Sequence, residues 1–195
     1  MALSKKKKKF LLYFSIVLIL IFVSNFFISS EIESKQELTI DKNIESVWVV
    51  MGDEFDEVDK WSANFHTSKA GGSNKYPGLP YSKRITETER GKTVQELDAF
   101  DPAAHSLEYH ITTGKPSIAA EARAKWSLVE DGSDKTNVIL EFNMIAKGWL
   151  GLFMSGKIKS KIDASSLELA EELKYYMEKG TPHPRNLAAS KNSIK

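Results

Sequence analysis

The chain opens with a long apolar segment. Residues 10–28 are almost all apolar and follow five consecutive lysines, Lys5 to Lys9. As a helix these 19 residues would reach about 28 Å, close to the roughly 30 Å hydrocarbon core of a bilayer. We therefore predict a transmembrane anchor over residues 10–28, after a Lys-rich cytoplasmic segment, residues 1–9. Because such lysines stay in the cytoplasm, the rest of a single-pass protein in the cell membrane would lie outside it.

A cleaved signal peptide is the alternative for the same segment. Signal peptides carry a shorter apolar region and end in small residues at the cleavage site. The far edge of the run has no Ala-x-Ala, although Ile28 and Ser30 could occupy cleavage positions. Cleavage would release a secreted protein, so both interpretations export the rest of the chain.

The remaining pattern predicts one domain of mixed helices and strands. Residues 29–36 are polar and are interpreted as a linker, and 37–40 as a short strand. Helical spacing of apolar residues follows at 44–51 and 55–61. Strands separated by short Gly, Pro or Asp turns are predicted at 81–88, 93–100, 106–112, 118–128 and 137–146. Neighbours joined by such turns should pair antiparallel.

Alternation along the strand at 118–128 identifies an inward face rich in small residues. Ile118, Ala120, Ala122, Ala124, Trp126 and Leu128 share that face. Alanines leave space in front of a curved sheet. Either a helix packs closely against them or a cavity remains.

The longest helical pattern covers residues 149–179, with an apolar stripe at steps of three or four. Gly180 ends it, and Pro182 and Pro184 prevent its continuation. Residues 181–195 are then a polar tail, which we expect to be disordered.

This order of elements resembles the α+β helix-grip fold, in which a curved antiparallel sheet wraps around a long C-terminal helix. Ile44-Glu45-Ser46-Val47-Trp48, Asp101-Pro102 and Lys147-Gly148 resemble motifs of the SRPBCC superfamily, in its START and polyketide cyclase/dehydrase-like group. The resemblance covers residues 37–180, preceded here by the predicted transmembrane helix. It implies an elongated apolar cavity between sheet and helix. Members bind lipids, sterols, polyketides or other hydrophobic molecules, and only some are enzymes.

The resemblance also implies which residues would line such a cavity. Arg84 stands where the family has an arginine and could reach a ligand's carboxylate or phosphate. An ion pair on the outer face of the sheet is the alternative for Arg84. The predicted ligand-binding residues are Trp61, Arg84, Tyr109, Ala122, Trp126, Phe142, Leu173 and Tyr176.

Composition excludes several kinds of chemistry. The chain has no cysteine, which removes disulfides, thiolate catalysis and Cys-based zinc sites. The four histidines are not spaced as metal ligands, and the acidic run at 53–59 lacks the spacing of a calcium loop. No nucleophile motif appears, so we expect no catalytic residue, metal or cofactor. Without Lys5 to Lys9, 22 basic residues face 26 acidic ones, and this balance does not favour nucleic acid as a partner.

The sequence therefore predicts a membrane-anchored domain outside the cytoplasm that binds a hydrophobic small molecule or lipid without covalent chemistry. A second hypothesis is a polyketide cyclase- or dehydratase-type enzyme, which needs an acid–base residue in the same cavity; Glu96 and Glu141 are its carboxylate candidates. A third is an interaction module with a collapsed cavity. The sequence names neither the ligand nor a protein partner.

Overall fold

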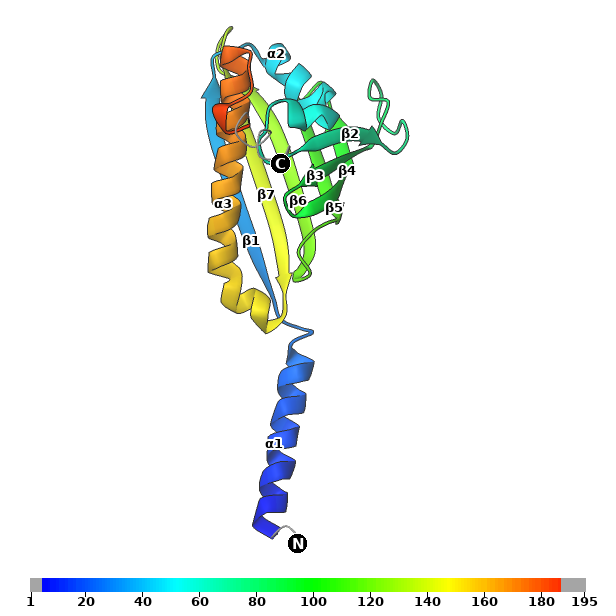
Figure 1. Cartoon of the computed structure of the whole chain (residues 1–195), viewed down its shortest axis with the longest axis vertical. Helices are drawn as coiled ribbons and strands as arrows, with labels where there is room; N and C mark the ends of the chain where they lie inside the picture. Colours follow the sequence, from blue (N-terminus) through cyan, green and yellow to red (C-terminus); the bar gives the residue numbers. More distant parts are fainter. Residues whose placement is uncertain (1–4, 187–195) are drawn as a thin grey trace, which may run out of the picture.

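The computed structural model describes residues 5–186 (Figure 1). In chain order the elements are α1 (Lys5–Ser24), β1 (Ser29–Ile40), α2 (Ile44–Trp48), the π-helical turn η1 (Val49–Asp53), the 3₁₀ helix η2 (Phe55–Lys60), β2 (Thr67–Gly71), β3 (Lys83–Thr88), β4 (Gly91–Asp101), β5 (Ser106–Thr113), β6 (Ala119–Glu130), β7 (Thr136–Lys147) and α3 (Gly148–Lys179). The helical and strand segments predicted after residue 40 are present. Only β2 was not expected.

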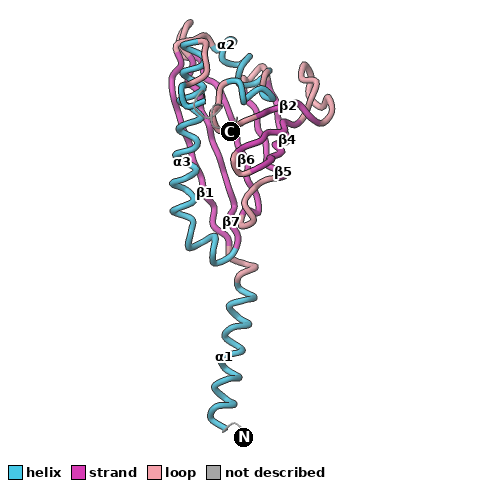
Figure 2. Tube along the Cα trace, in the orientation of Figure 1, coloured by secondary structure: helices cyan, strands magenta, loops and turns pink. Residues whose placement is uncertain are grey.

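The strands form one antiparallel sheet of seven, in the order β1-β7-β6-β5-β4-β3-β2 (Figure 2). Strands joined by short turns are neighbours, as predicted. The first strand pairs with the last, from Ser29 opposite Lys147 to Ile40 opposite Thr136.

Residues 29–36 are part of β1, not a linker. Polar residues dominate this segment, so the sequence does not show the alternation of inward and outward positions along it. Ile32 and Ser34 are nevertheless buried on the inward face, at 2% and 3% exposure. β7 supplies the backbone hydrogen-bond partners for the whole of β1. Strand formation in residues 29–36 therefore depends on residues far away in the sequence.

The long helix α3 packs on the inward face of the sheet, as the helix-grip fold requires (Figure 1). Its contacts are mainly with β1 and β7. Near its start, Gly151 lies so close to β7 that an added Cβ would be 2.9 Å from the carbonyl carbon of Ala146. Farther along, Leu173 enters the main apolar core. Gly180, with φ of 70°, ends the helix as predicted.

Helix α1 extends away from the domain, and none of its residues is buried (Figure 1). It ends at Ser24, and Ser29 already belongs to β1, so residues 10–28 are not one continuous helix. The apolar part of α1, residues 10–23, spans only about 21 Å. Along residues 5–186, no helix combines the length and the apolar character needed to cross a membrane. The predicted transmembrane helix is therefore not supported.

Residues 181–186 differ from the predicted disordered tail. Arg185 lies against α3 and forms ion pairs with Glu171 and Glu168. The ring of His183 contacts that of Tyr175, with centroids 4.9 Å apart. The remainder of the predicted tail lies outside the described residues.

Candidate functional site: a buried arginine in an aromatic core

Arg84 is the central polar group of the domain interior. It alternates inward on β3 and is 0% exposed. Its Nε donates a hydrogen bond to Oε1 of Gln95, its partner on β4, and its Nη1 donates to the carbonyl oxygen of Phe55 at 3.0 Å. Its Nη2 is buried and has no hydrogen-bond partner within residues 5–186. The predicted alternative, an ion pair on the outer face, is therefore wrong.

Aromatic rings surround the guanidinium group of Arg84. Its Cζ lies 4.0 Å from the ring centroid of Phe55, 5.1 Å from Trp126, 5.2 Å from Tyr109 and 5.5 Å from Phe65. These contacts are within the range of cation–π attraction, which is strongest for desolvated cations.

No carboxylate in the described part of the chain forms an ion pair with Arg84. Burial disfavours the charged form and lowers the pKa of Arg84 to about 10, so the group is still a cation at neutral pH. An unpaired buried charge costs several kcal/mol. Cation–π contacts and two hydrogen bonds offset part of that cost. The free N–H groups of Nη2 are available to an acceptor that enters the core.

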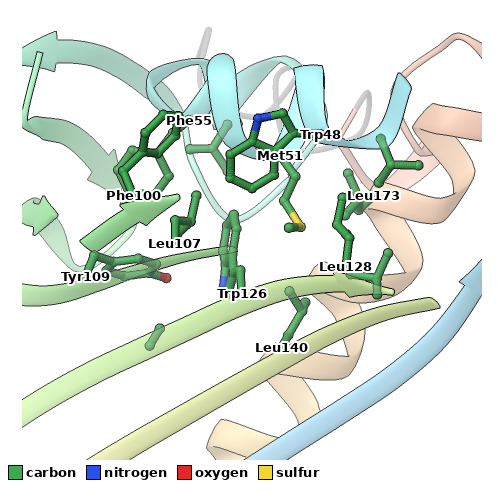
Figure 3. Close-up of a cluster of buried hydrophobic side chains, with 14 of the residues drawn as sticks. Trp48, Met51, Phe55, Phe100, Leu107, Tyr109, Trp126, Leu128, Leu140 and Leu173 are labelled. Carbon is green, nitrogen blue, oxygen red and sulfur yellow. The ribbon is translucent and has the colours of Figure 1, made fainter. Parts of the chain in front are cut away.

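The surrounding side chains form a packed aromatic cluster (Figure 3). Trp126 contacts the rings of Phe55, Tyr109 and Trp61, with centroids 6.1, 5.6 and 6.4 Å apart. Trp48, from α2, covers this cluster from the helical side. The part of the expected apolar cavity nearest α2 is therefore occupied by side chains.

The structure brings most of the predicted ligand-binding residues together. Trp61, Tyr109, Trp126 and Leu173 are buried in the main core, and Phe142 and Tyr176 pack against it. Ala122 belongs instead to a second cluster, with Ile32, Ala119, Met144 and Ala146, toward the start of α3. Ile158 and Ile162 of α3 cover that cluster, so a helix packs against the alanine face there.

An open groove of about 800 Å³ adjoins the core. Tyr109, Ala124 and Phe142 are among its lining residues, together with Lys159 and Asp163 of α3. The other lining residues are charged or polar, so this groove is more polar than the predicted cavity. Tyr109 borders both the groove and the guanidinium of Arg84.

The two carboxylates proposed for acid–base chemistry differ in position. Glu96 is on the opposite side of β4 from Gln95, and a hydrogen bond from Lys83, 2.9 Å away, lowers its pKa. Glu141 alternates with the inward Leu140, faces Lys35 across the β1–β7 pair and is among the residues that line the groove. Neither carboxylate forms an ion pair with Arg84.

Glu172 is a buried carboxylate that the sequence analysis missed. It is 1% exposed and accepts hydrogen bonds from Oγ of Ser62 and from the backbone N–H of Ala63, both at 2.9 Å. Arg185 approaches it at 3.8 Å. Through these hydrogen bonds, Glu172 connects α3 to the segment after η2. Within residues 5–186, no three His, Asp or Glu side chains come together to hold a metal ion.

Gln95, Phe55 and Phe65 were also missed. A signal for Gln95 was present, because the hairpin joining β3 and β4 sets Arg84 opposite Gln95. Two polar residues paired on the inward face of a hairpin are unusual and indicate a buried polar contact. Phe55 is the first residue of η2 and Phe65 follows η2, and no local pattern places them beside Arg84.

Comparison with known proteins agrees with this architecture. The family model for "Polyketide cyclase / dehydrase and lipid transport" matches residues 31–174. No curated protein is similar in sequence at a significant level. A START superfamily protein from Mycobacterium smegmatis superposes with a TM-score of 0.63 at 14% identity, over 76% of this chain and 99% of that chain.

Two further solved structures have the same fold. Ara h 8.0201 gives a TM-score of 0.57 at 19% identity, over 76% of this chain and 98% of its own. A solution structure from Thermobifida fusca gives 0.58 at 19% identity, over 77% and 97%. These identities are low and establish the fold alone. The family match over residues 31–174 shows that this chain belongs to the polyketide cyclase/dehydrase and lipid transport family.

Proposed function

We propose that the domain binds a hydrophobic small molecule or lipid that carries one anionic or strongly accepting group, and that Arg84 holds this group. The observation that carries the proposal is the free Nη2 of a fully buried arginine that has no carboxylate partner. A carboxylate or phosphate would supply the missing charge and hydrogen bonds.

The apolar part of such a ligand would lie in the groove bordered by Tyr109, Ala124 and Phe142. Tyr109 both lines this groove and contacts Arg84, so we expect its ring to move when a ligand binds. Ligand sites of this kind combine an apolar lining with a few polar groups that fix orientation.

The test compares two ligands and two variants. Oleate and oleyl alcohol share a chain length and differ in head group, so only oleate offers a carboxylate. We expect Arg84→Lys to weaken oleate binding about tenfold, since a charged hydrogen bond contributes about 1.5–3 kcal/mol, and to leave oleyl alcohol binding unchanged. Native mass spectrometry of the full chain released from detergent would measure both.

Arg90→Gln, in the exposed β3–β4 turn, is the matched control. A melting temperature for each variant shows whether the fold persists. Equal loss of both ligands in Arg84→Lys, or no binding of either by the unsubstituted chain, would refute the proposal.

We further propose that α1 attaches the domain to a membrane by inserting its apolar surface among lipids. Phe10, Leu12, Phe22 and other large apolar side chains of α1 are more than 40% exposed, and no residue of α1 is buried. Lipid is the solvent in which such a surface is stable. Flotation of the full chain with vesicles tests attachment, and intact mass after expression tests cleavage of the segment as a signal peptide.

The side of the membrane on which the domain lies stays a prediction from Lys5 to Lys9. Protease protection of the domain in intact cells would test it. The enzyme hypothesis stays a prediction: Glu96 is not among the residues that line the groove, whereas Glu141 is.

A further inference from the structure

An exposed apolar patch surrounds the point where α1 joins the domain. It consists of the exposed Phe26, Phe27, Leu150 and Phe153 together with the half-buried Trp149, and we call it the base patch. Phe27 is 83% exposed, Phe153 78%, Phe26 71% and Leu150 57%. Soluble surfaces rarely gather large apolar side chains at this density, so the base patch needs a partner.

Hydrogen bonds fix the base patch beside the end of α1. The indole Nε1 of Trp149 donates to Oγ of Ser24 at 3.1 Å, and its backbone N–H donates to Oδ1 of Asn25 at 3.0 Å. The N–H of Gly148 donates to the carbonyl oxygen of Ile28 at 2.8 Å. The first turns of α3 and the end of α1 therefore form one joint at the base of the domain (Figure 1).

The outward face of α3 changes from apolar to basic with distance from this joint. Leu150, Phe153, Lys157 and Lys161 follow one another at steps of three and four, which places them on one side of the helix. Ile158 and Ile162 each lie about 100° round the helix from the lysine before them and pack on the sheet. The stripe thus starts with apolar side chains at the joint and continues with lysines.

The side chains of the two lysines in this stripe have no polar partner within the described part of the chain. Lys157 and Lys161 are exposed, and neither forms an ion pair or hydrogen bond with any described residue. By contrast, Lys159 on the sheet side pairs with Asp163 at 3.1 Å. Apolar side chains at the acyl boundary with lysines one or two turns away match the layers of an anionic bilayer surface.

We infer that the base patch rests on the surface of a bilayer containing anionic lipids, with Lys157 and Lys161 at the headgroups. This inference depends on the proposed attachment through α1, whose apolar surface is continuous with the patch. The inference adds a defined orientation of the domain relative to the bilayer surface. The domain is seated on the lipid by the start of α3 and is not free to swing on a tether.

The absence of cysteine makes a site-specific test direct. Single cysteines at Phe153→Cys, Leu167→Cys and Ile19→Cys would carry a nitroxide label on the full chain in vesicles of phosphatidylcholine and phosphatidylglycerol. Leu167 is an exposed apolar residue about 21 Å farther along α3, which makes it the matched control. Electron paramagnetic resonance then compares accessibility to oxygen and to a water-soluble nickel reagent.

We expect the oxygen-to-nickel accessibility ratio at Phe153→Cys to be several-fold higher than at Leu167→Cys. The same label should become more aqueous when Lys157→Gln and Lys161→Gln are combined, but not with Lys179→Gln at the far end of α3. A lipid-exposed label at Ile19→Cys with equal ratios at the other two sites would overturn the seating and leave attachment intact. An aqueous label at Ile19→Cys would overturn attachment itself. Dipolar broadening between Phe153→Cys labels would show that a second copy of the chain covers the patch, which also overturns the inference.

Discussion

At the scale of single residues, the domain contains two buried charges that are treated in opposite ways. Glu172 has two hydrogen-bond donors and a nearby arginine, so its charge is compensated within the chain. Arg84 has aromatic rings, two acceptors and one unused nitrogen. The hydrogen bonds of Glu172 hold α3 against the segment after η2. The arrangement around Arg84 leaves a cation that forms no ion pair with any carboxylate among the residues described.

Buried tyrosines make a prediction about alkaline pH. Burial raises the pKa of Tyr109 and of Tyr81 above the ordinary value near 10. In the unfolded chain both phenols ionise near pH 10, so their contribution to stability is complete below that pH and is lost as pH rises through the higher folded-state values. Arg84 acts in the opposite direction over the same range, because its pKa is lowered to about 10.

We therefore expect the free energy of unfolding to fall less steeply above pH 10 in Tyr109→Phe than in the unsubstituted chain. Urea unfolding between about pH 8 and 11 measures this. Tyr13→Phe, on exposed α1, should keep the original slope. Identical slopes in all three proteins would show that Tyr109 titrates normally and that its burial is not as described.

At the scale of elements, close approach between α3 and the sheet depends on a glycine. A Cβ at Gly151 would lie 2.9 Å from the carbonyl carbon of Ala146 and 3.0 Å from its Cβ. A Cβ at Gly156, five residues farther along the same helix, would meet nothing within 4 Å. Both glycines belong to α3, but Gly151 faces Ala146 of β7 and Gly156 faces open space.

The same substitution should therefore have opposite effects at these positions. Gly151→Ala is expected to destabilise the domain by about 1–3 kcal/mol, because the helix must move off β7. Gly156→Ala should stabilise it by about 0.5–1 kcal/mol through helix propensity. Urea unfolding midpoints of the full chain in detergent would measure both. Stabilisation by both substitutions would mean that α3 does not pack tightly on β7 at this point.

At the scale of the whole molecule, pairing between β1 and β7 joins the two ends of the domain. Residues 29–36 supply most of that pairing near α1 and bury Ile32 in the second cluster. A chain beginning at residue 37, the boundary predicted from sequence, would expose the edge of β7 and uncover Met144 and Ala146.

Two truncations test this boundary. We expect residues 29–195 to fold with a single cooperative transition. Residues 37–195 should unfold at a lower urea concentration or aggregate, because an unpaired edge strand is exposed. Equal midpoints would restore the linker interpretation of residues 29–36.

Local patterns were sufficient for the strands from β3 to β7, the long helix and the inward positions of Tyr109 and Trp126, because alternation and helical spacing reflect which side chains are buried. They were insufficient for β1, whose polar residues become a strand only beside β7. They were also insufficient for the limits of α1, because an apolar run does not show where its helix ends.

The amino-acid pattern was enough to establish the fold class, the order of the elements from β3 to α3 and the apolar segment at the start. The packing of the elements was needed to show that Arg84 faces inward without an ion-paired carboxylate and that the base patch gathers around the end of α1. Both features join residues far apart in the chain: Arg84 with Tyr109 and Trp126, and Ser24 with Trp149. Periodicity records which face of its own element a residue occupies. What that face meets depends on how the elements pack.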